Sequence, residues 1–152
     1  MRKMKGLMAG FAVAAGLVVL SGTAHSADAG GRIPDGTVEA GNSPKTGKAM
    51  YTTAADAPGT FTFDEAMYYC AALDVNGHDD WRLATKAELS VLWENRDKGA
   101  LKGTFNVTGS YPAGWYWSST EDSYGAVRQR FSNGGQNWGS EFNCSSLRCV
   151  RG

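Results

Sequence analysis

The stretch from Gly114 to Gly152 constrains the fold most, because stiff apolar side chains alternate there with runs of Ser, Gly, Asn and Gln. Its stiff apolar anchors include Trp115, Tyr116, Trp117, Val127, Phe131 and Val150. An aromatic frame that carries small, adaptable polar residues is typical of a recognition surface. It is a poor composition for a catalytic centre, which needs titratable groups. We therefore expect strands and loops that bind a ligand, and no enzyme activity.

The N-terminal segment has the order of a secretory signal. Residues 1–6 are short and basic, residues 7–20 are uncharged and apolar, and residues 21–27 are small and polar. Cleavage is expected after Ser26 or Ala27. The apolar run is shorter than the roughly twenty residues of a membrane span, and an uncleaved anchor is the alternative. We expect an exported protein (periplasmic, cell-surface or secreted) without a stable membrane span after cleavage.

The charge of the remaining chain excludes some partners. The signal segment holds three basic residues and no acidic one, which leaves 12 basic and 15 acidic side chains. No basic patch is evident, so we do not expect nucleic acid as a partner. His78 is the only histidine that remains, which argues against a His-rich zinc site. We expect no metal and no cofactor.

The cysteines are Cys70, Cys144 and Cys149. An exported protein meets an oxidising compartment, where two of them should pair and one is left over. The residues alone do not say which one is left.

The N-terminal half predicts a linker and two helices. Residues 28–48 are rich in Gly, Pro, Thr and Ser and are expected to form a flexible linker, with a domain over residues 49–152 that opens on a strand at 49–53. Thr62 with Glu65 forms a capping box that starts a helix ending near Leu73. We expect its inward face to carry Phe63, Met67, Cys70 and Ala71.

The second capping box, Thr85 with Glu88, opens a helix that ends near Arg96. Further along, strands are expected at 115–118, 126–131 and 147–151, with a long polar loop from Gln136 to Ser146. Helices followed by short strands with long loops indicate the α+β class.

Three motifs carry a resemblance to a known family. Residues 80–89 (DWRLATKAEL) resemble its WRLPT-x-x-EL motif, residues 116–121 (YWSSTE) its YWSST motif, and residues 147–151 (LRCVR) its closing RCVR. This is the Lcl C-terminal domain family, and the resemblance covers about residues 49–152. It implies a C-type-lectin-like fold, related to formylglycine-generating sulfatase-modifying enzymes, with a small, mostly antiparallel sheet. Ala84 stands where the family usually has Pro, which is expected to loosen the turn there.

The resemblance also implies a Cys70–Cys149 disulfide, so that Cys144 is the unpaired cysteine. Some family members are variable proteins of diversity-generating retroelements, and two segments here look unconstrained by the motifs. These segments predict a ligand-binding surface of Asp122, Ser123, Tyr124, Gly125, Asn133, Gly135, Asn137, Trp138, Ser140, Phe142, Asn143 and Cys144. The expected ligand is a protein or another cell-surface molecule.

Within these segments, Trp138, Tyr124 and Phe142 are expected to be exposed anchors for the partner. The other tryptophans in the domain are expected to lie in the core: Trp81, Trp93, Trp115 and Trp117.

Three alternatives remain open. The C-x4-C spacing of Cys144 and Cys149 resembles the copper-binding pair of the formylglycine-generating enzymes, which would make the protein a thiol oxidase. The polar loops would only solvate the fold if the protein is a structural component of the envelope. Four oxygen-bearing side chains in one turn would suit calcium, although they match no complete loop motif: Asp74, Asn76, Asp79 and Asp80.

Overall fold

The computed structural model describes residues 28–152, and the signal segment expected over residues 1–27 lies outside them. Two sheets and two α-helices make up this part, which confirms the α+β prediction. No helix within residues 28–152 is long and apolar enough to span a membrane.

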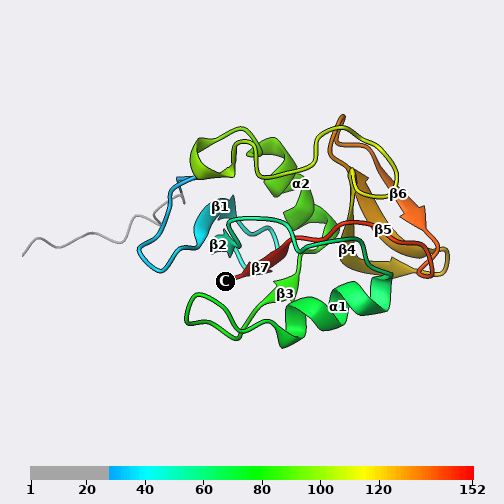
Figure 1. Cartoon of the computed structure of the whole chain (residues 1–152), viewed down its shortest axis with the longest axis horizontal. Helices are drawn as coiled ribbons and strands as arrows, with labels where there is room; N and C mark the ends of the chain where they lie inside the picture. Colours follow the sequence, from blue (N-terminus) through cyan, green and yellow to red (C-terminus); the bar gives the residue numbers. More distant parts are fainter. Residues whose placement is uncertain (1–27) are drawn as a thin grey trace, which may run out of the picture.

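The first sheet has the strand order β1-β2-β7-β3 and the second has the order β4-β5-β6; all their strand pairs are antiparallel (Figure 1). Their bounds are β1 Val38–Asn42, β2 Ala49–Thr52, β3 Arg82–Leu83, β4 Trp115–Asp122, β5 Gly125–Arg130, β6 Gln136–Gly139 and β7 Cys149–Arg151. The helices are α1 Phe63–Ala72, α2 Lys86–Glu94 and a short 3-10 helix, η1, at Gly99–Leu101. The chain end returns to the first sheet as β7, between β2 and β3.

Both α-helices begin at the predicted capping boxes. The Thr62 hydroxyl accepts from the Glu65 backbone N–H while Glu65 accepts from the Thr62 N–H, and Thr85 and Glu88 do the same. The prediction of the inward face of α1 is only half right. Its buried residues are Phe63, Ala66 and Cys70, whereas Met67 and Ala71 are exposed.

The buried residues follow the i, i+3 and i+7 spacing of a narrow helical stripe, and Cys70 in this stripe is bonded to Cys149 of β7. Met67 and Ala71 lie outside the stripe.

The prediction of a flexible linker over residues 28–48 is wrong in the second half of this segment. Residues 38–42 form β1, which pairs with β2, and the Val38 and Ala40 side chains are completely buried. The small side chains are what permit this packing. At Gly41, which has a φ of 110°, a Cβ atom would lie 2.9 Å from a Val91 side-chain carbon on α2. Small residues there indicate close packing, not flexibility.

The long polar loop expected over Gln136–Ser146 begins instead with a strand. β6 takes its first four residues and pairs with β5. The Gln136 side-chain amide donates to the Lys86 carbonyl and to the Ser90 hydroxyl. The polar side chain at the start of β6 therefore finds its hydrogen-bond acceptors on α2. The closing strand, expected over residues 147–151, is shorter than predicted, because β7 covers only Cys149–Arg151.

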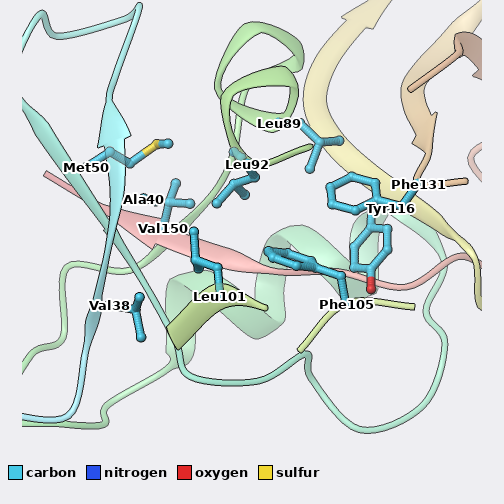
Figure 2. Packing of buried hydrophobic residues seen from close by; sticks show 11 residues of the cluster. Val38, Ala40, Met50, Leu89, Leu92, Leu101, Phe105, Tyr116, Phe131 and Val150 are labelled. Atoms are coloured by element: carbon cyan, nitrogen blue, oxygen red, sulfur yellow. The ribbon is translucent and has the colours of Figure 1, made fainter. Parts of the chain in front are cut away.

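Strand β4 divides the hydrophobic core into two clusters. Successive side chains of a strand point to opposite faces, and Tyr116 and Trp117, both fully buried, accordingly enter different clusters. Figure 2 shows Tyr116 against Phe131 and Phe105, with Leu89 and Leu92 of α2 above them. Trp117 packs with α1, its ring meeting Phe63 edge to face. The two clusters fix the second sheet between the two helices.

The tryptophans follow the expectation in part. Trp81 and Trp117 are buried, while Trp93 and Trp115 are only partly buried. Ala84, at the position of the family proline, is fully buried, and its carbonyl accepts from the Ser119 N–H at 2.8 Å. The Ala84 carbonyl therefore ties β4 to the turn before α2.

Candidate functional site: the outer end of the second sheet

The motif residues and the disulfide hold the fold together at three places, which we call joints and which together form the frame: the network around Arg148, the ion pairs of Glu88 and Asp80, and the Cys70–Cys149 bond. The first joint is the network around the buried Arg148. Its Nε donates to Asp56 at 2.9 Å, Nη1 to the Thr53 carbonyl at 3.0 Å and Nη2 to the Thr104 carbonyl at 2.6 Å. Asp56 also accepts a short hydrogen bond from the Tyr116 hydroxyl. Every nitrogen of a fully buried cation is thus satisfied, which is the condition for tolerating it.

The pKa directions in this network follow from burial. Burial raises the pKa of Asp56 despite the nearby Arg148, and burial with the Asp56 charge raises that of Tyr116. This network joins the YWSST motif to the closing RCVR motif.

The second joint is Glu88 at the start of α2. Its carboxylate accepts from the Arg82 guanidinium at 2.6 and 2.7 Å, from the Ser43 hydroxyl at 2.6 Å and from the Thr85 N–H at 3.0 Å. Burial opposes ionisation, but these hydrogen bonds outweigh it and lower the pKa of Glu88 to about 2. Asp80 pairs likewise with Arg151 of β7 at 2.7 Å. The motif residues of these joints bond to one another and to neighbouring segments of the fold.

The third joint is the disulfide between Cys70 and Cys149, which confirms the predicted pairing. Cys144 is free and half-buried. The bond links α1 to β7 across a sequence separation of 79 residues.

An exposed aromatic pair lies outside this frame, at the end of the second sheet where β4 turns into β5. Tyr124 of that turn is 79% exposed and Trp138 of β6 is 53% exposed. Their ring centroids lie 5.7 Å apart. Gly125 lets the turn approach β6, because with its φ of 130° a Cβ atom would lie 2.5 Å from the Gly139 carbonyl oxygen. Two large rings are therefore held in contact at the surface instead of in the core.

The loop after β6 lies at the same end of the sheet. Phe142 is 91% exposed, and Glu141 lies close enough to Glu121 that a hydrogen bond between the two carboxyl groups raises the pKa of Glu141. The loop is anchored on the helix side, where the Glu141 carbonyl accepts from the Phe63 N–H at 3.0 Å. Because the carboxyls of Glu121 and Glu141 stand at this surface, it is acidic as well as aromatic, which the sequence analysis missed.

Two of the predicted site residues lie elsewhere, and a third, Cys144, follows Asn143 in the loop but is half-buried. Asn133 and Gly135 belong to the turn between β5 and β6, which is at the opposite end of the sheet from the turn between β4 and β5. Successive turns of an antiparallel meander alternate between its ends, which here lie about 17 Å apart along the six residues of β5. The Asn133 side chain closes its own turn by accepting from the Gly135 N–H.

The structure thus brings most of the predicted residues to one end of the sheet. We call this end the recognition surface and define it as Asp122, Ser123, Tyr124, Gly125, Trp138, Ser140, Glu141, Phe142 and Asn143. Asn137 precedes Trp138 on β6 and borders it. A cleft of about 190 Å³ next to Trp138 is lined by Lys86, Val127, Gln136, Asn137 and Trp138. Lys86 was not expected, since it comes from the start of α2, far away in sequence.

The sequence model of the Lcl C-terminal domain family matches residues 42–151. The chain belongs to this family. No curated protein matches the chain. The family match begins at Asn42, the last residue of β1, so most of that strand precedes it.

Other candidates in this Lcl C-terminal domain have structural partners. Among the proposed calcium residues, Asp80 is engaged by Arg151, and no group of three or more His, Cys, Asp or Glu side chains within residues 28–152 is arranged to hold a metal ion. His78 contacts Asp35 at 2.7 Å, and hydrogen bonds from Thr37 and His78 lower the pKa of Asp35 to about 2.

A larger cleft, of about 460 Å³, runs along the outer side of α1 and is lined mainly by aromatic and aliphatic side chains. Its lining includes Phe61, Tyr68 and Leu73. None of the predicted site residues lines it, so it is a second surface, separate from the recognition surface.

Proposed function

We propose that the protein is an exported binding module that recognises a protein or another cell-surface molecule through the recognition surface, without performing chemistry. The observation that carries the proposal is the exposed contact between Tyr124 and Trp138. Aromatic side chains give large contact areas at low entropic cost, and they dominate the energetics of binding surfaces. Ser123, Ser140 and Asn143 around them supply adaptable hydrogen bonds.

The alternatives have less support. The disulfide occupies Cys149, so the thiolate pair that a copper thiol oxidase needs is not available with Cys144. A purely structural envelope protein gives no reason to hold Tyr124 against Trp138 at the surface, where large apolar contacts mark interaction sites.

The proposal includes diversification of the recognition surface by a retroelement. The free Cys144 supports it, since an unpaired cysteine has no structural role in the loop of an exported protein. A template repeat and a reverse transcriptase gene beside the coding sequence are expected in the source genome. Their absence would remove diversification and leave the binding role untouched.

The test of the binding role is the double variant Trp138→Ala with Phe142→Ala. Fluorescently labelled chain is incubated with intact cells and with isolated envelopes, and bound label is counted by flow cytometry and by sedimentation. We expect the variant to lose at least about 2 kcal/mol of binding, or roughly thirtyfold in affinity, because both side chains are hot-spot candidates. Its thermal midpoint should stay within a few degrees of the parent.

The matched control is Tyr68→Ala, which removes a ring that is 75% exposed on α1. This variant should bind like the parent. Equal loss of binding in the control, or unaltered binding by the double variant, would contradict the assignment of the surface.

A further inference from the structure

Arg128 of β5 lies on a face of the second sheet away from the Tyr124–Trp138 pair. It is paired in register with Trp117 on β4, whereas Trp138 is paired with the neighbouring Val127 and so faces the other side. The guanidinium carbon lies 5.1 Å from the ring centroid of Trp115, 5.2 Å from that of Tyr111 and 5.9 Å from that of Trp117. Three aromatic rings therefore surround one cation.

Two of the three guanidinium nitrogens of Arg128 lack hydrogen-bond partners among residues 28–152. The Nε and Nη1 atoms are both buried, and neither donates to an acceptor in this part of the chain. Nη2 is not among the buried atoms that lack a partner. Gly139 of β6 closes one side, because a Cβ atom there would lie 2.8 Å from Nε. Buried donors without acceptors are rare and costly. Aromatic rings offset part of the charge but accept no conventional hydrogen bond.

The comparison with Arg148 shows that the fold can satisfy an arginine where it needs one. Arg148 donates from all three nitrogens. Nε and Nη1 of Arg128 have no such acceptor among residues 28–152.

Arg130 extends the same face. It lies two residues further along β5, opposite Trp115, and its Nε donates to the Gly109 carbonyl at 3.0 Å. Neither Arg128 nor Arg130 forms an ion pair with a carboxylate among residues 28–152. Residues two apart on a strand are spaced by about 7 Å, and an extended partner chain has the same spacing between alternate side chains.

We propose that Arg128 and Arg130, with Tyr111 and Trp115, form a second binding site that takes an acidic segment of a polypeptide in extended conformation. Carboxylates at alternate positions of the segment would accept from the two guanidinium groups, while intervening side chains contact the rings. The spacing and the combination of Arg, Tyr and Trp, the residues enriched at protein hot spots, favour a polypeptide over other anions. The proposal rests on the role of the protein as a binding module and adds a partner chemistry to it.

The Tyr111 ring beside the guanidinium is 56% exposed, so a movement of this ring would open the site to a partner. The carboxylate would then accept from both terminal nitrogens, the strong bidentate geometry of arginine.

The test uses the purified exported chain and a fluorescein-labelled peptide of alternating Glu and Thr, with binding followed by fluorescence anisotropy at low salt. Two peptides serve as controls: the same sequence with Gln for Glu, and a peptide of equal composition with all Glu residues in one block. We expect the alternating peptide to bind best. Arg128→Gln should weaken its binding at least about tenfold, as removal of one partner of a desolvated charge pair does. Arg130→Gln should weaken it about threefold.

The control variant is Arg96→Gln, because Arg96 also stacks on a tryptophan, at 4.3 Å from the Trp93 ring, but has no unpaired buried donor. It should leave binding unchanged. If Arg128→Gln unfolds, Arg128→Lys keeps the charge without the fork and should still weaken binding.

The proposal is overturned if the alternating peptide fails to bind, if the Gln peptide binds equally, or if Arg128→Gln has no effect. Binding of polygalacturonate in place of the peptide would also overturn it. The Trp138→Ala, Phe142→Ala variant should still bind the peptide, so the two sites fail or succeed separately.

Discussion

The frame and the recognition surface contain the same kinds of side chain in opposite situations. Trp117 is fully buried between β4 and α1, while Trp138 is half exposed on the edge strand of the same sheet. Cys149 is bonded, and Cys144 is free. The difference teaches that residue type alone does not reveal a role in this protein. What reveals it is whether the fold supplies each side chain with a partner.

Removal of the disulfide is expected to have the largest effect on the unfolding free energy, and it compares a bonded cysteine pair of the frame with the free cysteine of the loop. The double variant Cys70→Ala with Cys149→Ala should lose about 4 kcal/mol of unfolding free energy, because the bond closes a long loop in the unfolded chain. Urea denaturation monitored by tryptophan fluorescence measures the loss. Cys144→Ser should change the unfolding free energy by less than about 0.5 kcal/mol. An equal cost for both variants would erase the distinction between frame and loop.

Arg148 should come next. Arg148→Gln leaves the Asp56 carboxylate buried without its cation, and breaking a buried pair in this way costs about 3–4 kcal/mol. Equilibrium denaturation at neutral pH is the measurement. Arg128→Gln, on the second sheet, removes a cation that has no ion pair and should leave the unfolding free energy unchanged or raise it. A strong destabilisation by Arg128→Gln would mean that this arginine belongs to the frame.

Glu88 gives a smaller effect with a signature in pH. Its pKa in the folded chain is about 2, against 4.5 as its ordinary value. A lowered carboxylate pKa stabilises the fold above the ordinary value, and this contribution is lost as the pH falls from about 4.5 towards 2. Glu88→Gln should therefore cost about 2 kcal/mol at pH 7, a value reduced because Arg82 is partly exposed.

The control for Glu88 is the slope of the unfolding free energy against pH, compared between the parent and the Glu88→Gln variant. The parent should lose unfolding free energy faster than the variant between pH 4.5 and pH 2. In this range the Glu88 carboxyl is protonated in the unfolded chain but still ionised in the folded one, and the variant lacks this carboxyl. If the unfolding free energies of parent and variant changed in parallel with pH, the ionised Glu88 carboxylate would not stabilise the fold.

The sequence was sufficient for the parts of the fold that depend on local chemistry. Both capping boxes are confirmed because a Thr and a Glu three residues apart form their two reciprocal hydrogen bonds within one helix turn. Distant residues add to them, since the Phe63 N–H donates to the Glu141 carbonyl and the Lys86 N–H donates to the Thr120 hydroxyl. The disulfide pairing came from the resemblance and is confirmed as well.

The parts that depend on distant partners were not predictable. β1 is held by its pairing with β2 and by the closeness of Gly41 to α2, and neither is visible in a stretch of small residues. The separation of Asn133 from the recognition surface follows from the order of the strands in the second sheet. Glu141 and Lys86 reach the surface only because two segments far apart in sequence meet there.

The central claim is that the frame specifies the fold without help from the recognition surface. The most direct measurement is the unfolding free energy of one chain in which five exposed residues of that surface and its border are replaced by Ser: Asp122, Tyr124, Asn137, Trp138 and Phe142. We predict a single cooperative unfolding transition within about 1 kcal/mol of the parent, as expected for exposed positions. A loss of more than about 3 kcal/mol, or of cooperativity, would show that these residues belong to the core and would contradict the account.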